Sequence, residues 1–169
     1  MEAAVWGFIG TIVGALASIC TSTISSWNSH ALAIKAKNFE REEMAKEFQR
    51  KTILELQKEL PEYIRSCDQI YRNFRNHHEK TGRWEYSISD ELDIENRNMT
   101  LRVINLIQRI DNDELRESLV KLQNNCTACL FAEERDDADR LYGEFLQGFQ
   151  GILVLLGEVL RTTYWQKNA

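Results

Sequence analysis

The sequence predicts an all-α protein in which an N-terminal transmembrane helix continues into an antiparallel four-helix-bundle-like domain. The 169 residues include one proline and eight glycines, too few turn-forming residues for a fold of many strands. Residues 3–20 carry no charged side chain, and a run of about 20 such residues crosses a hydrocarbon core of about 30 Å. Further along the chain, apolar residues recur every three or four positions, which is typical of helices with one packed face.

The charge distribution divides the chain into differently solvated parts. Residues 1–34 hold one acid, Glu2, and no lysine or arginine, so all 21 basic residues and the other 25 of the 26 acids follow them. The formal charge of −5 lacks the basic excess of a general nucleic-acid binder, and duplex nucleic acid is not an expected partner. We predict a transmembrane helix and interface in 1–34, a helical connector in 35–60 and a cytoplasmic helical bundle in 61–169.

The flanks of the apolar run indicate an uncleaved membrane span. A signal peptide begins with basic residues, whereas here Glu2 precedes the run and Lys35 and Lys37 follow it. Trp6 and Trp27 stand near its ends, where indole rings favour the lipid headgroups. The positive-inside rule then predicts a single-pass membrane protein with its N-terminus outside and its C-terminal domain in the cytoplasm. A buried core helix of a soluble protein is the alternative.

Small residues share one stripe of the predicted span: Gly7, Gly10, Gly14 and Ser18. Such a stripe lets membrane helices approach closely, so we predict a homo-oligomer packed through it. Hydroxyl groups in the same segment, including those of Thr11 and Thr21, suggest a narrow polar pathway between the helices. Glycine is also common in membrane helices without such a role.

The first helix is expected to run unbroken beyond the membrane, because residues 35–60 contain no glycine or proline. Pro61 predicts a kink or a helix restart, and Gly82 predicts the end of the helix within the loop 80–87. The expected packed face is Ile53, Leu56, Leu60, Tyr63, Cys67, Ile70 and Phe74.

Three more helices are expected, each with a start signal. Ser87 or Ser89 caps the second, Asp111–Glu114 caps the third, and the acidic run 133–139 forms a turn or the first turn of the fourth. The fourth is expected to end before Tyr164, and its stretch 151–157 is too short for a second span and is expected to be buried. The expected packed faces are Leu92, Asn96, Met99, Val103, Leu106 and Ile110; Leu115, Leu119, Leu122, Cys126 and Phe131; and Leu141, Phe145, Phe149, Ile152, Leu156, Val159 and Leu160.

Neither catalysis nor metal binding is indicated. The chain has no glycine-rich phosphate loop, no H-E-x-x-H and no G-x-S-x-G. Cys126 and Cys129 form a C-x-x-C, but no strand pattern surrounds it, and the histidines have no zinc-ligand spacing. Cys67, Cys126 and Cys129 are therefore expected to be buried free thiols, and no cofactor is expected.

A basic cluster at the end of the first helix is the candidate ligand site. It consists of Arg72, Arg75, His77, Arg83 and Trp84. Arginine forks grip phosphates and an indole can stack on a base, which would suit a small phosphate-bearing ligand. Basic residues at a helix C-terminus are also favoured simply by the helix dipole.

Four short segments carry a resemblance: Phe48–Gln57, Lys80–Trp84, Asp90–Leu92 with Asn96-Arg97, and Asp113–Arg116. They resemble an uncharacterised bacterial family with one N-terminal membrane helix and a small helical cytoplasmic domain. This resemblance implies the same architecture, placed in the bacterial inner membrane, and brings no established activity. The architecture is also similar to that of small membrane effectors in prokaryotic anti-phage systems, some of which sense a cyclic oligonucleotide and then damage the inner membrane.

The expected function is that of a non-enzymatic, oligomeric membrane effector or pore-forming protein. Its cytoplasmic helical domain would control it through an anionic nucleotide signal in prokaryotic anti-phage defence. The alternative is a membrane-tethered scaffold that docks a partner protein. The expected partners are thus the lipid bilayer, further copies of the chain, and either a small nucleotide or a partner protein.

Overall fold

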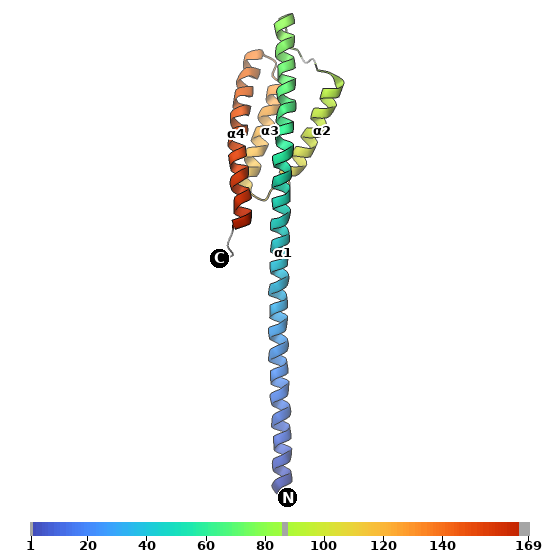
Figure 1. Cartoon of the computed structure of the whole chain (residues 1–169), viewed down its shortest axis with the longest axis vertical. Helices are drawn as coiled ribbons and strands as arrows, with labels where there is room; N and C mark the ends of the chain where they lie inside the picture. The colour runs from blue at the N-terminus through green and yellow to red at the C-terminus, as the bar shows by residue number, and fades with distance from the viewer. Residues whose placement is uncertain (1, 86–87, 166–169) are drawn as a thin grey trace. The chain divides into compact units, whose positions relative to one another are not determined.

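The computed structural model describes the backbone of residues 2–85 and 88–165, and the side chains of this part from residue 6 onward. The described residues form four α-helices and no strand, which confirms the all-α prediction. The helices are α1 (Glu2–Thr81), α2 (Asp90–Ile107), α3 (Asp113–Leu130) and α4 (Arg135–Trp165) (Figure 1).

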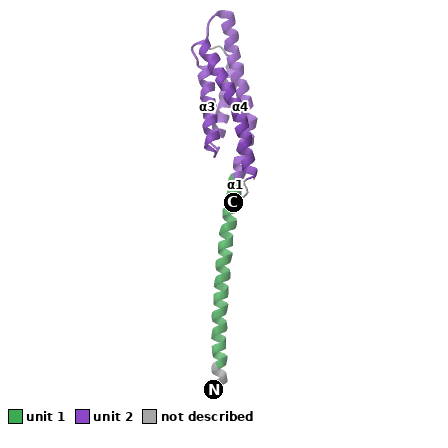
Figure 2. Ribbon diagram, turned by 90° about the vertical axis from the view of Figure 1, so that its left-hand side faces the viewer, with its two compact units in different colours: residues 1–45 green, residues 46–169 purple. Residues whose placement is uncertain are grey.

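The chain divides into two compact units, residues 1–45 and residues 46–169 (Figure 2). The helix α1 contributes its first half to the former unit and its second half to the latter. The division of the sequence into 1–34, 35–60 and 61–169 stays a prediction.

In the first unit, every described side chain from residue 6 to residue 42 is exposed. The exposed side chains include large apolar ones, with Trp6 at 72% and Trp27 at 78%. Among the described residues, two helices, α1 and α4, are long and apolar enough to cross a membrane. None of the most apolar stretch of α1 is buried, against 17% of that of α4. Core helices of soluble proteins can share these properties, so the membrane span itself is taken up below as a proposal.

In the second unit, all four helices contribute to one hydrophobic core. The seven residues predicted for the packed face of the first helix are all buried, which confirms that face. Fully burying an aliphatic side chain stabilises the fold by about 1.5–3 kcal/mol, so this seam holds the C-terminal half of α1 in the unit. Large, fully buried side chains of the shared core come from each helix: Ile53, Leu56 and Leu60 of α1, Val103 and Ile107 of α2, Leu115 and Leu119 of α3, and Phe145 and Leu156 of α4.

Local sequence signals set the helix ends. Gly82 has a φ of 69°, a conformation that favours glycine, and it follows the last residue of α1. The Ser89 hydroxyl accepts a hydrogen bond from the Leu92 amide, and the Asn112 side chain accepts one from the Leu115 amide at 2.8 Å. These N-caps confirm the predicted starts of α2 and α3. Ser87, the other cap candidate, lies outside the described residues.

Two local predictions need correction. No helix restart occurs at Pro61, because α1 continues through it; the alternative at this position, a kink, stays a prediction. Proline removes one backbone donor, but Leu60, Tyr63 and Ile64 are buried around it, and their packing holds the helix in place. Phe131 is 71% exposed, since α3 ends at Leu130 and Phe131, the C-cap residue, no longer follows the helical spacing of the buried stripe.

The fourth helix also departs from its prediction. It extends through Trp165, beyond the expected end before Tyr164. Within the stretch 151–157, Ile152 and Leu156 are buried as expected, whereas Leu153 and Val154 are exposed. The reason is geometric: α4 packs on one side only, so residues about 100° further round the helix face outward.

Candidate functional site

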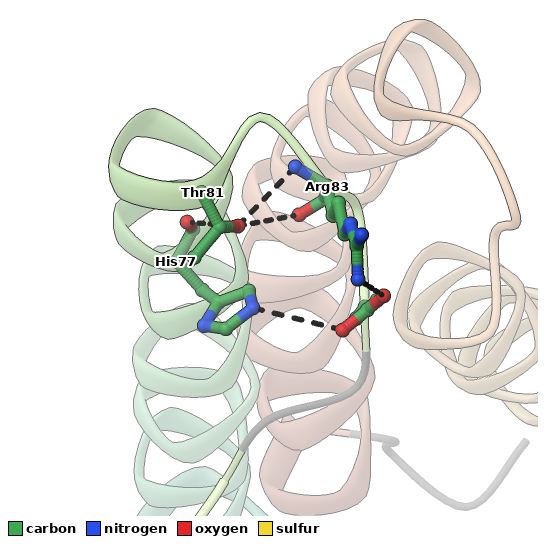
Figure 3. Close-up of polar contacts among 4 residues, drawn as sticks. His77, Thr81 and Arg83 are labelled. Atoms are coloured by element: carbon green, nitrogen blue, oxygen red, sulfur yellow. Dashed lines mark hydrogen bonds and ion pairs between the residues drawn. The ribbon is translucent and has the colours of Figure 1, made fainter.

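The structure divides the predicted basic cluster between two places. Arg72 and Arg75 line a cavity of about 330 Å³. His77 and Arg83, which Figure 3 labels, instead face Glu85, with their nitrogens 3.9 and 3.8 Å from its carboxylate oxygens. The remaining lining residues of the cavity are Tyr71, Asn76, Glu79 and Tyr142.

Each arginine of the cavity has a carboxylate partner on its own helix. The Arg72 Nε lies 2.8 Å from an oxygen of Asp68, and the hydrogen bond to Asp68 raises the pKa of Arg72. The Arg75 guanidinium is 3.6 Å from Glu79, and both of these side chains are largely exposed. An exposed ion pair of this kind contributes about 1 kcal/mol or less to stability. A phosphate that accepts two hydrogen bonds from the Arg75 guanidinium would therefore displace Glu79 at small cost.

Two stacked tyrosines form the wall of the cavity. Tyr71 of α1 and Tyr142 of α4 lie with ring centroids 3.9 Å apart and planes 8° from parallel. The Tyr71 hydroxyl donates to Asp139, and the Tyr142 hydroxyl donates to Asp68, the partner of Arg72. This network ties α1 to α4 behind the arginines. Burial and the hydrogen bond to Asp68 raise the pKa of Tyr142 to about 12, and burial and Asp139 raise that of Tyr71 as well.

These raised pKa values predict a loss of stability in alkali. A tyrosine whose pKa is higher in the folded chain stabilises the fold fully below its unfolded pKa of about 10, and this contribution is lost as the pH rises through the folded value. The free energy of unfolding should therefore fall between pH 10 and pH 12, less steeply in Tyr142→Phe than in wild type. Urea unfolding of the full chain in detergent measures the slope. Tyr164→Phe, at an exposed position, is the control and should match wild type. A full wild-type slope in Tyr142→Phe would contradict the prediction.

Trp84 is held by packing and does not line the arginine cavity. Its indole nitrogen donates to the Ala132 carbonyl oxygen at 3.0 Å. The ring makes an edge contact with Phe74, at a centroid distance of 6.0 Å, and lies 6.4 Å from Tyr71. The indole thus joins the loop after α1 to the loop after α3. Its N–H donates to the backbone and its ring packs on other aromatic rings.

Sequence reasoning missed a larger cavity, of about 730 Å³, between α1, α2 and α3. Its walls are mostly apolar, and they include Ile70, Leu101 and Phe131. Asn96 was expected on the packed face of α2, and it lines this cavity while its amide donates to Ser66 Oγ at 3.0 Å. No pattern in the sequence indicates such a cavity, because it arises where three helices separated along the chain meet.

The small-residue stripe of α1 has open space around it in a single chain. A Cβ added at Gly7, Gly10 or Gly14 would meet no atom within 4 Å beyond its chain neighbours and the backbone of its own helix, and Ser18 is exposed. The hydroxyl groups of Thr11 and Thr21 each donate at 2.9 Å to the carbonyl four residues back in α1. The two hydroxyl protons thus already have acceptors within α1. Toward another helix, each threonine offers chiefly the lone pairs of its oxygen as hydrogen-bond acceptors.

Among the described residues, no group of three or more histidine, cysteine or acidic side chains is arranged to hold a metal ion. Comparison of the chain with known protein families, curated proteins and solved structures found no match in any of the three.

Proposed function

We propose that this chain is a single-pass protein of the bacterial inner membrane that acts as a non-enzymatic, oligomeric effector or pore-forming component. The observation that carries the proposal is the continuity of α1: one helix joins an exposed apolar segment to a half that is buried in the core of residues 46–169. A change in the helical domain can therefore act directly on the helix that enters the bilayer. The uncharged run and the basic residues after it support the span, with the N-terminus outside.

The helical domain is proposed to be an antiparallel four-helix bundle. Short connections between consecutive helices, and buried residues from all four in one core, support this arrangement. The exposed stripe of Gly7, Gly10, Gly14 and Ser18 supports assembly of several copies through the membrane helices.

Control by a small phosphate-bearing nucleotide is proposed at the cavity beside Arg72 and Arg75, as in a prokaryotic anti-phage system. The volume of about 330 Å³ is at the lower end of the range for small-molecule sites, which favours a compact ligand. Arg75 can exchange its exposed partner Glu79 for a phosphate, whereas Arg72 donates to both carboxylate oxygens of Asp68 and is held more firmly. Arg75 is thus the side chain on which ligand affinity should depend most.

Dye release from vesicles that contain the full chain tests this proposal. A panel of cyclic nucleotides should include one that releases the dye through wild-type protein. Arg75→Ala should need about ten- to a hundredfold more of it, because one charge-assisted contact contributes about 1.5–3 kcal/mol. Arg83→Ala is the matched control: it removes an arginine outside the cavity and should respond like wild type.

A membrane-tethered scaffold is the second candidate function. It is favoured by the apolar cavity between α1, α2 and α3, whose rim carries the exposed side chains of Leu101 and Phe131. A scaffold should leave the membrane intact. Vesicles that stay tight with every nucleotide would therefore overturn the effector and favour the scaffold.

A further inference from the structure

Two cysteine thiols meet in the core of the helical domain. Cys67 of α1 and Cys126 of α3 lie 59 positions apart in the sequence, yet their sulfur atoms are 2.6 Å apart. Both residues are buried, with 2% and 1% of their surface exposed, and both are free thiols in this structure. A disulfide joins its sulfurs at about 2.05 Å, so a bond between these two requires a small movement of the side chains.

The surroundings distinguish the two sulfurs. Cys67 Sγ accepts hydrogen bonds from the Cys126 thiol and, at 3.6 Å, from the Asn96 amide, while the Tyr63 side chain interacts with both sulfurs. These donors, the Cys126 thiol first, lower the pKa of Cys67. The hydrogen bond to Cys67 and burial raise the pKa of Cys126. Because the thiolate is the reactive form and the Asn96 amide donates to the Cys67 sulfur, Cys67 is placed as the attacking thiolate and Cys126 as the thiol that resolves the mixed disulfide.

The large apolar cavity reaches the residues around this pair. Its walls include Tyr63 and Asn96, which both hydrogen-bond to Cys67, and Thr127, which follows Cys126 in α3. A reagent in the cavity therefore reaches the sulfur of Cys67 when the Tyr63 or Asn96 side chain moves aside. At about 730 Å³, the cavity is large enough for a small organic compound.

We propose that Cys67 and Cys126 are a site of reversible oxidation by a small-molecule disulfide. The Cys67 thiolate attacks one sulfur of the reagent, forms a mixed disulfide and expels a thiolate. Cys126 then loses its proton and attacks the Cys67 sulfur, which expels the second thiolate and leaves a Cys67–Cys126 disulfide. Two protein thiols have lost two electrons, the reagent has gained them, and the two protons end on the two released thiols.

The bond would join α1 covalently to α3. Since α1 also carries the exposed apolar segment, the site couples the oxidation state to the helix that the proposed function places in the membrane. The oxidation itself does not depend on that function. Cys129, one turn along α3, is the competing partner; it is buried, and burial raises its pKa to about 12.

The test treats the full chain in detergent with oxidised or reduced glutathione, blocks the remaining thiols by alkylation, and maps the peptides by mass spectrometry. Oxidised glutathione should lower the intact mass by about 2 Da through loss of two hydrogens and give a peptide that links Cys67 to Cys126. The midpoint of thermal unfolding should rise by about 10 °C, because the bond closes a long loop of the unfolded chain. Reduced glutathione should reverse both changes.

Matched variants locate the bond. Cys67→Ala and Cys126→Ala should each lose the link and the rise in the midpoint, whereas Cys20→Ala and Cys129→Ala should keep both. If a variant fails to fold, peptide mapping of the wild-type chain still shows whether Cys67 is linked to Cys126. Cys67 and Cys126 that both remain open to alkylation, a stable adduct of glutathione on one of them, or a Cys126–Cys129 link would each overturn the proposal.

Discussion

Deletion of residues 1–34 should move the protein from the membrane pellet to the soluble fraction. Apolar residues such as Leu, Ile, Phe and Val each favour insertion by about 0.3–0.6 kcal/mol at the centre of a span, and residues 3–20 contain no charge to oppose them. In the full chain, the side chains of residues 6–34 are all exposed, the large apolar ones included. Water is a poor solvent for this surface, so the full chain should resist extraction by alkaline carbonate and the deletion variant should not.

The control for this experiment addresses the other apolar helix. Val154 of α4 is 62% exposed, and Val154→Lys introduces a charge into the most apolar part of that helix. This variant should remain in the pellet, because α4 joins the core through Ile152 and Leu156. If Val154→Lys moved to the soluble fraction while the deletion variant stayed in the pellet, the membrane segment would lie in α4 and not in residues 1–34.

The packing of α1 could be predicted because it depends on local spacing. A helix of 3.6 residues per turn brings positions three and four apart onto one side, so the stripe from Ile53 to Phe74 was readable without knowledge of its partners. Helix caps were readable for the same reason: Asn112 bonds to an amide three residues away. Pro61 shows the limit, since the helix restart that its local preference predicts does not occur where Leu60, Tyr63 and Ile64 are buried in the core.

The candidate sites depend on contacts that the sequence does not encode locally. Arg75 and His77 stand two positions apart and thus face different directions on a helix, so a cluster along the chain became two groups in space. The stacking of Tyr71 on Tyr142 and the meeting of Cys67 with Cys126 join helices far apart along the chain. Buried thiols were expected at both cysteines, but their contact follows from the relative register of α1 and α3 in the core.

Gly14→Leu should lower the association constant of the full chain in mild detergent by about tenfold or more, which corresponds to about 1.4 kcal/mol. The Cβ that this change adds has open space around it, since it would meet no atom within 4 Å beyond its chain neighbours and the backbone of its own helix. Any loss must therefore come from contacts with another copy, where close approach of two backbones requires a small residue. Cross-linking and size measurements follow the oligomer, and dye release from vesicles should fall with it.

Ala15→Leu is the control that distinguishes loss of packing through the stripe from a general effect of a larger side chain. Ala15 follows Gly14 directly and therefore faces about 100° away from it, outside the stripe of Gly7, Gly10, Gly14 and Ser18. Both variants add a leucine side chain at neighbouring depths in the proposed span, so both should insert. Ala15→Leu should assemble like wild type. Equal losses in the two variants would mean that bulk alone disturbs the assembly, and no loss in either would mean that the helical domain of residues 46–169 holds the copies together.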